Sequence, residues 1–311
     1  MVLDHSALAG KLQLLKQPYT NATIITHHKS GTLAGMHLIA ALCCEQWKPD
    51  CTKDPGSCGF WSAWSAGCMD TCRDQGVDFA YNGWWGSWSP NNPKTVVHFL
   101  RHPVDMVVSG YLYHLSGAEF ASQRVPSRGN FGYITFQFRN NYAQRAVPAI
   151  RWLLGATGDE SYAQLLERGS AEAGVEAETA RAIAAENGIA EMFYNQRRFQ
   201  PGKEGVGHVV NVCLSDVSSS SSATDATGWA QVGAALPGVD VAKLVEATGD
   251  TRGKGHSTTQ GSDGTLRTTL RSLAERSLKS WLTEEDAAMM EAFPCQAEED
   301  NGELVDRLKL A

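Results

Sequence analysis

The segment from Ala22 to Cys44 constrains the fold of this chain more than any other. It opens with a β-branched run at 23–26, which predicts a short buried parallel strand. A polar loop with the sequence HHKSGT follows at 27–32, and the mostly apolar residues 33–44 predict a helix. In such an arrangement the loop amides and the helix N-terminus can bind a phosphate group. The segment therefore predicts an anion-binding loop within an α/β fold.

The loop residues supply complementary groups for an anion. The ammonium group of Lys29 supplies a positive charge, and Gly31 allows the backbone to approach an anion closely. Thr32 can cap the helix and offer a hydroxyl group. The loop is not a Walker A loop, because that pattern places glycines before the lysine, where this chain has His27 and His28. A polar strand-to-helix turn that binds no ligand is the alternative.

A second strand–turn–helix unit lies at 94–116. The nearly continuous apolar run at 95–100 predicts a buried strand, and Arg101 follows directly after it. Pro103 suits the first position of a helix, whose apolar residues then recur at helical spacing. Ser109 falls on the side of this helix that faces back toward the strand end. Arg101 and Ser109 are therefore predicted to converge on one anion, and a surface arginine is the alternative.

These two units, in this order, resemble the nucleotide-binding motifs of the sulfotransferases that use 3′-phosphoadenosine-5′-phosphosulfate (PAPS). The loop at 27–32 is similar to their 5′-phosphosulfate loop, and the arginine and serine of the second unit are similar to their 3′-phosphate site. The resemblance implies a single domain over 1–311, with a central parallel sheet flanked by helices, like that of P-loop NTPases. It assigns nucleotide binding to Lys29, Ser30, Gly31, Thr32, Leu33, Arg101 and Ser109.

The resemblance also implies the activity, which is transfer of a sulfuryl group from PAPS to a hydroxyl or amine of a small-molecule or glycan acceptor. Lys29 would stabilise negative charge on the bridging oxygen as the sulfur–oxygen bond breaks, and no metal is implied. A late loop of the family contains arginine, lysine and glycine and contacts the 3′-phosphate. Arg252, Gly253 and Lys254 resemble this loop in a different order, and a plain basic turn is the alternative.

The chain departs from the family pattern at two places. Leu33 and Ala34 stand where cytosolic members have a threonine and a tryptophan that stacks on adenine. Those members also carry a histidine base on a strand before the 3′-phosphate arginine, but the corresponding zone, 77–82, contains no histidine. Asp78 is the best-placed ionisable group there, and His28 is the second catalytic candidate. The reserve candidates for the base are His27 and His114.

Residues 45–92 form an insert rich in tryptophan and cysteine, with six of the nine tryptophans of the chain. Aromatic residues among glycine, serine and proline suit a lid or a pocket for a partly apolar acceptor. The alternative is that they only stabilise an irregular insert, which we expect to include a strand at 77–81. The cysteines of this region indicate either two disulfides or a zinc site, and both readings stay open. These cysteines are Cys51, Cys58, Cys68 and Cys72.

The rest of the chain predicts mainly helices. We expect helices over 140–154 and 161–198, and we expect their charged residues to form solvated faces. A buried strand is predicted at 208–214, followed by a serine-rich loop at 215–228. A last helical region is predicted over 266–293.

Composition limits the partners and the location of the protein. The formal net charge of −7 and the pI near 5.7 argue against binding to nucleic acid or to anionic membranes. No apolar run approaches the length that spans a bilayer, and the N-terminus is a poor signal peptide. We therefore expect a cytoplasmic protein.

Two other functions stay open from the sequence. Another P-loop kinase or NTPase would bind ATP with magnesium, and the missing Walker A glycines oppose this possibility. A non-catalytic sulfotransferase-like domain would use the insert to bind a glycan or a protein. The absence of the stacking tryptophan and of the histidine base favours that possibility.

Overall fold

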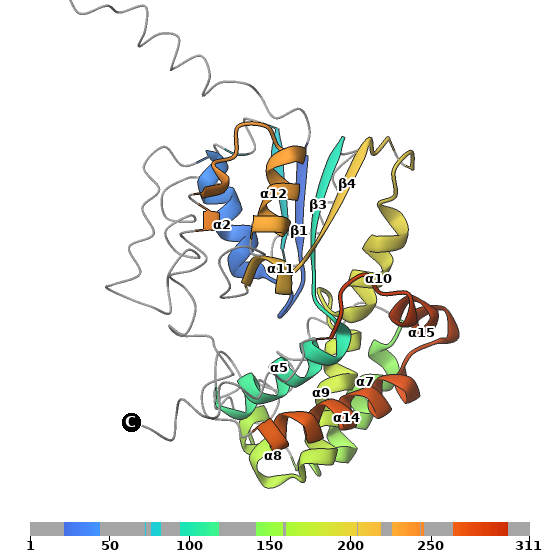
Figure 1. The fold of residues 1–311 in the computed structure, drawn as a ribbon. Helices are drawn as coiled ribbons and strands as arrows, with labels where there is room; N and C mark the ends of the chain where they lie inside the picture. Colours follow the sequence, from blue (N-terminus) through green and yellow to red (C-terminus); the bar gives the residue numbers. More distant parts are fainter. Residues whose placement is uncertain are drawn as a thin grey trace, which may run out of the picture.

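A computed structural model describes ten parts of the 311-residue chain. They are residues 22–43, 72, 76–81, 94–117, 141–157, 160–203, 205–218, 226–242, 244–245 and 264–297. In these parts a parallel sheet leads at its carboxyl edge into a group of helices (Figure 1). The predicted α/β class is therefore confirmed.

The sheet has four parallel strands in the order β2-β1-β3-β4. The strands are β1 (Ala22–Thr26), β2 (Val77–Tyr81), β3 (Thr95–Leu100) and β4 (His208–Cys213). Ile24 of β1 lies opposite Phe79 of β2 and opposite Val97 of β3. All of β1 and nearly all of β3 are buried, as expected for parallel strands that are covered on both faces. The four predicted strands are confirmed.

Helices α2 (Thr32–Cys43), α11 (Ser215–Ser218) and α12 (Ala226–Ala235) lie on one side of the sheet (Figure 1). Their apolar residues, Leu38 and Trp229 among them, form one core with Ile24 and Phe99 of the strands. On the other face, Phe199 and Val206 pack with Ile25 and Val96 in a smaller cluster. Both faces of β1 and β3 are therefore covered.

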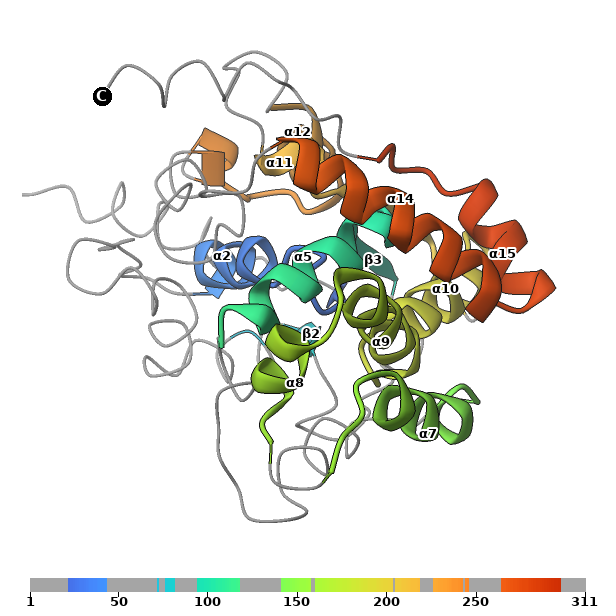
Figure 2. The ribbon, with the colours of Figure 1, turned by 90° about the horizontal axis from the view of Figure 1, so that it is seen from below.

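The helical layer, which is the group of helices at the carboxyl edge of the sheet, is built around α9. Its helices are α5 (Pro103–Leu115), α7 (Ala143–Leu153), α8 (Tyr162–Arg168), α9 (Ala171–Ala184), α10 (Ile189–Arg198), α14 (Gly264–Trp281) and α15 (Glu284–Glu291). Helix α9 contacts α5, α7 and α14, which surround it in Figure 2. It is rich in alanine and buried on nearly every side, because small side chains let its neighbours approach closely.

Two predicted helices are interrupted in the structure. The helix expected over 161–198 is three helices, because Ser170 caps the start of α9 and a turn at 185–188 precedes α10. The last helical region divides at Thr283, whose side chain accepts a hydrogen bond from the amide of Asp286 at the start of α15. Serine and threonine favour these capping positions over helix interiors. The helix predicted over 140–154 is slightly shorter in the structure, where α7 begins at Ala143 and ends at Leu153.

Two disulfides lie within the described residues. Cys43, at the end of α2, pairs with Cys72, and Cys213, at the end of β4, pairs with Cys295. Cys72 therefore pairs outside the cluster in which the sequence analysis placed it. Cys51, Cys58 and Cys68 lie outside the described residues, as do most of the 45–92 insert and residues 219–225 of the serine-rich loop.

None of the described helices is both long enough and apolar enough to cross a membrane.

Candidate anion-binding site

Ser30 closes the loop between β1 and α2. Its amide donates to the carbonyl oxygen of His27 at 3.0 Å, and its hydroxyl accepts from the His27 amide at 2.8 Å. The same hydroxyl lies 3.0 Å from the His27 carbonyl oxygen and 3.3 Å from that of Phe99. Ser30 is fully buried, and both of its polar groups are used inside the loop. Of the amides that the sequence analysis assigned to the anion, those of Gly31, Thr32 and Leu33 remain.

The loop backbone is left-handed at two positions. Lys29 has a φ of 62° and Gly31 has a φ of 106°. A β-carbon at Gly31 would lie 3.3 Å from Cδ1 of Leu214, so conformation and packing both favour glycine here. Helix α2 begins at the next residue, Thr32. The first amides of a helix have no partner within it and carry partial positive charge, so they can receive an anion.

Arg101 brings the second predicted motif against this loop. Its Nη1 donates to the carbonyl oxygen of Lys29 at 3.2 Å. The contact follows from the topology, because β1 and β3 are parallel neighbours and both loops leave the same edge of the sheet. The structure therefore places the two predicted anion-binding loops side by side.

The ammonium group of Lys29 lies over the ring of Tyr113, 2.9 Å from its centroid. Tyr113 and Ser109 are four residues apart on α5 and so share one face of the helix. Ser109 is almost completely buried on that face, at 7% exposure. The helix face under Lys29 is therefore the one that carries Ser109.

Asp78 does not lie at this edge of the sheet. It pairs with Thr23, near the start of β1, whereas the anion-binding loop leaves the other end of that strand, after Thr26. A strand rises about 3.3 Å per residue, which separates the Asp78 backbone from the loop by about 10 Å. This register disfavours Asp78 as the base, and its catalytic role stays a prediction. Arg252, Gly253 and Lys254 lie outside the described residues.

His28 faces the helical layer. Its ring is parallel to that of His114, with centroids 5.7 Å apart. Its Nε2 is buried and has no hydrogen-bond partner within the described residues. Burial lowers the pKa of His28 well below its usual value, and the charges of Arg181 and Lys29 lower it further. His28 is therefore neutral at neutral pH and has a lone pair that can accept a proton.

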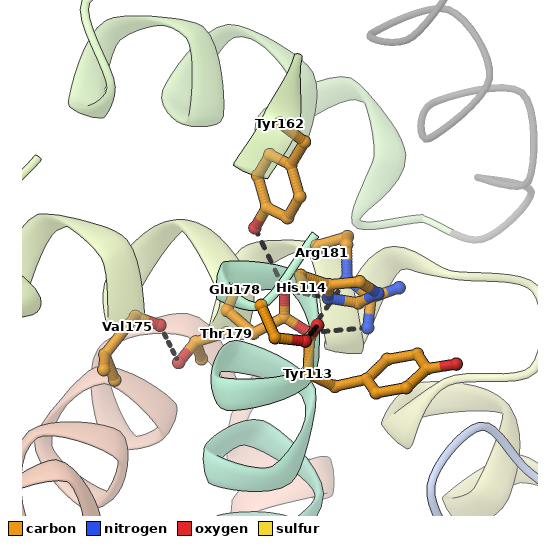
Figure 3. Close-up of polar contacts among 8 residues, drawn as sticks. Tyr113, His114, Tyr162, Val175, Glu178, Thr179 and Arg181 are labelled. Carbon is orange, nitrogen blue, oxygen red and sulfur yellow. Dashed lines mark hydrogen bonds and ion pairs between the residues drawn. The ribbon is translucent and has the colours of Figure 1, made fainter. Parts of the chain in front are cut away.

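The His114 ring that stacks on His28 contacts a buried carboxylate, that of Glu178. Figure 3 shows this carboxylate with its three donors. Glu178 accepts hydrogen bonds from Tyr162 and from His114, each at 3.0 Å, and it pairs with Arg181 at 2.6 Å. Burial alone would raise the pKa of the Glu178 carboxyl, but Arg181 and His114 outweigh it and hold this pKa at about 2. A β-carbon at Gly110 would collide with the carboxylate, so that glycine makes room for it.

The charges of Glu178 and Arg181 were expected to be solvated, and that prediction is wrong. Glu178 is 0% exposed and Arg181 is 3% exposed. The sequence did contain a signal, because the two residues stand three apart within an alanine-rich helix that has few other residues able to contact water. A helix of small apolar residues is expected to be buried on most sides.

His27 and His98 form a second buried pair that the sequence analysis missed. Their Nε2 atoms lie 2.8 Å apart, so one ring donates and the other accepts, and both are neutral. Burial lowers the pKa of His27 to about 3. Burial and the neighbouring His27 lower the pKa of His98 well below its usual value. This pair joins the first residue of the loop to β3, so His27 has a structural role.

His28 and Arg181 face one narrow hollow between the loop and α9. The other residues that line it are Met106, Ala182, Ala185 and Gly188. The hollow is too narrow for a water molecule in this conformation. The Nε2 atom of His28 is buried, although the residue as a whole is partly exposed.

Within the described parts of the chain, no three or more histidine, cysteine, aspartate or glutamate side chains are grouped so that they could hold a metal ion.

Comparison of the chain with protein-family models, curated proteins and solved structures finds no match.

Proposed function

We propose that the protein is a PAPS-dependent sulfotransferase with a P-loop-like architecture. The observation that carries the proposal is the hydrogen bond from Arg101 to the Lys29 carbonyl. It joins the two loops that the sequence resemblance assigns to the 3′-phosphate and to the 5′-phosphosulfate of one nucleotide. A nucleotide with phosphates at both positions needs two cationic sites close together, and an ordinary adenine nucleotide needs only one.

Different residues would bind the two phosphate groups of the nucleotide. The amides of Gly31, Thr32 and Leu33 at the start of α2 would receive the 5′-phosphate, with Lys29 beside the sulfuryl group. Arg101 and Ser109 would bind the 3′-phosphate. Lys29 must leave the Tyr113 ring to reach the donor. A cation–π contact contributes only about 0.5–2 kcal/mol, so this exchange is feasible when an anion arrives.

The reaction needs a base but little covalent help. The acceptor oxygen or nitrogen attacks the sulfur atom, and the bond from sulfur to the bridging oxygen of the phosphate breaks. Adenosine 3′,5′-bisphosphate leaves with the bond electrons, and Lys29 stabilises the developing charge. The proton of the acceptor passes to a base. His28 is the candidate, because it adjoins Lys29 and its Nε2 has no hydrogen-bond partner within the described residues.

We place the protein in an oxidising compartment rather than in the cytoplasm that the sequence analysis expected. Disulfides persist in oxidising compartments and are rare in the cytosol, and this chain forms two within its described residues. A small molecule or a glycan with a free hydroxyl or amine remains the proposed acceptor. The net charge of −7 disfavours nucleic acid.

Calorimetric titration in EDTA tests the donor site. The ligands are adenosine 3′,5′-bisphosphate, AMP, and ATP with excess magnesium in a separate run. A charge-assisted hydrogen bond contributes about 1.5–3 kcal/mol, so we expect the bisphosphate to bind about 10- to 100-fold more tightly than AMP. Equal affinities for the bisphosphate and AMP, or binding of ATP only with magnesium, would contradict the proposal.

A non-catalytic binding domain of the same fold is the second candidate. The buried Nε2 of His28 and the engagement of Lys29 with Tyr113 favour it, because neither group is presented to a ligand in this conformation. This candidate predicts that the bisphosphate binds weakly or not at all, with acceptor binding intact. It also predicts that the protein neither transfers sulfate to any hydroxyl acceptor nor hydrolyses PAPS.

A further inference from the structure

The disulfide between Cys213 and Cys295 lies next to the proposed donor site. Cys213 is the last residue of β4, and Cys295 follows α15 near the end of the described chain. The two residues are 82 positions apart, and both are buried within the core of the helical layer. The bridge therefore fastens the segment after α15 to the carboxyl edge of the sheet.

Leu214, the residue after Cys213, binds the end of β3 and lies close to the Gly31 loop. Its amide donates to the carbonyl oxygen of Leu100 at 2.8 Å, directly before Arg101. Its side chain also lies close to Gly31, since Cδ1 is 3.3 Å from the position that a β-carbon would take there. A displacement of Leu214 would therefore reach both loops at once.

On the other side of the bridge, Phe293 packs against the start of α5. Its ring stands edge-on to His102, with centroids 6.1 Å apart, and to Phe193 of α10 at 6.0 Å. His102 is the residue that caps α5, because its Nδ1 accepts from the amide of Val104 at 3.4 Å. It also follows Arg101 directly. Phe293 therefore fixes the cap of the helix that carries Ser109.

We propose that the Cys213–Cys295 disulfide and Phe293 are a positioning element of the donor site. The disulfide holds Leu214 against the Gly31 loop and Phe293 against His102, and so it fixes the loop that carries Arg101. This inference rests on the proposed function for the identity of the ligand. Its structural part, which is the order of the turn that begins α5, stands apart from any ligand.

The chain offers a matched control in its other described disulfide. Cys43 ends α2, whereas the anion-binding loop precedes its first residue, so the Cys43–Cys72 bridge is at the far end of that helix. Both bridges restrict the unfolded chain, so removal of either one lowers stability. Only removal of the Cys213–Cys295 bridge is expected to loosen the start of α5.

The experiment compares the double variants Cys213→Ala/Cys295→Ala and Cys43→Ala/Cys72→Ala by amide hydrogen exchange. The probes are the amides of Val104 and Met106, which donate to Nδ1 and to the carbonyl oxygen of His102. We expect their exchange to be at least about tenfold faster in the first variant and unchanged in the second. We also expect the first variant alone to lose about tenfold in affinity for adenosine 3′,5′-bisphosphate.

A further pair of variants keeps both disulfides. Phe293→Ala should speed the exchange of the same two amides, because it removes the ring that holds His102. His102→Asn should retain more protection of Val104 than His102→Ala does, since asparagine can cap a helix. These variants decide the question even if the variant that lacks the Cys213–Cys295 bridge does not fold.

Two outcomes would overturn the inference. One is equal exchange at Val104 and Met106 in both double variants, and the other is unchanged exchange in Phe293→Ala. If the unmodified protein binds no bisphosphate, the proposed function fails, and the exchange rates still decide whether the bridge positions the turn. If the bisphosphate binds and neither the rates nor the affinity change, the inference alone fails.

Discussion

The guanidinium group of Arg101 donates a hydrogen bond to the carbonyl oxygen of Lys29, 3.2 Å away. Lys29 has a left-handed backbone, so this contact holds a conformation that a lysine adopts at a cost of about 1–2 kcal/mol. Arginine has five N–H donors, and one of them suffices for the carbonyl. The same guanidinium can therefore shape the first loop and bind an anion beside it.

Arg101→Gln should lower the affinity for adenosine 3′,5′-bisphosphate more than the affinity for AMP. The 3′-phosphate would lose a charge-assisted partner of about 1.5–3 kcal/mol, which is about 10- to 100-fold in affinity. AMP should lose only the few-fold that follows from a looser Lys29 loop. Titration calorimetry measures both, with Arg151→Gln on the exposed side of α7 as the control. An equal loss for the two nucleotides would mean that Arg101 only supports the loop.

Replacement of Lys29 by glycine and by alanine should separate strain from function. Both variants remove the ammonium group, and we expect each to reduce PAPS hydrolysis by at least about a hundredfold, as loss of one group that stabilises transition-state charge does. Only glycine adopts the φ of 62° freely, so Lys29→Gly should be more stable than Lys29→Ala by about 1 kcal/mol. Urea unfolding measures the difference. Equal stabilities would show that the loop relaxes when the side chain is shortened.

His28→Gln should reduce the transfer of the sulfuryl group and leave nucleotide binding intact. Loss of a general base costs about 10²–10⁴-fold in rate. Because burial and nearby cations lower the pKa of His28, its base form persists at neutral pH, and the rate in the unmodified protein should be flat from pH 8 to pH 6. Hydrolysis of PAPS, followed by release of sulfate, measures both effects. Wild-type rates in the variant would exclude His28 as the base.

The two motif units were predictable because their signals are local. A β-branched run, a loop with Lys29 and Gly31, and an apolar helix follow one another without interruption. Their juxtaposition followed from a topological rule, since the carboxyl ends of neighbouring parallel strands share one edge. The proximity of Arg101 to the Lys29 loop could therefore be predicted from the sequence.

The buried polar pairs were not predictable in this way. His27 meets His98 across 71 positions, and His114 meets Glu178 across 64. The strand pattern predicts that His98 is buried, but each partner comes from a distant element, so the pairing could not be read from the local pattern. The position of Asp78 was missed for a related reason. The residue type suits a base, but the strand register that pairs Asp78 with Thr23 could not be read from the sequence.

Glu178→Gln should destabilise the protein strongly. The change leaves Arg181 buried without its counter-charge, and loss of one partner of a buried ion pair costs about 3–5 kcal/mol. The double variant Glu178→Gln/Arg181→Met should recover part of this loss, because it removes the unpaired charge as well. Urea unfolding of the two single variants and the double variant measures the coupling. Additive losses would mean that the two side chains do not stabilise each other.

The stability of the protein should fall with acid in a window set by its buried histidines. The pKa of His27 is about 3 in the folded protein and near 6.5 when unfolded, so below pH 6.5 the unfolded chain binds a proton that the native protein does not. Between its folded and unfolded pKa values, each such histidine lowers the free energy of unfolding by about 1.4 kcal/mol for each pH unit of acidification. Above pH 7 it has no effect. The pKa of His98 is also lowered, so it adds to the slope.

Glu178 does not contribute to the pH dependence of stability over most of this pH range. Its pKa is about 2 in the folded protein, against 4.5 as the ordinary value, so its contribution is complete above pH 4.5 and is lost only below it. Urea unfolding between pH 7 and pH 5 therefore isolates the histidines. The variant His27→Gln/His98→Gln, which keeps polar groups at both positions, should show a shallower slope than the unmodified protein. His208→Gln, at an exposed position on β4, should leave the slope unchanged. Identical slopes in all three proteins would show that the histidine pair accepts a proton without loss of the fold.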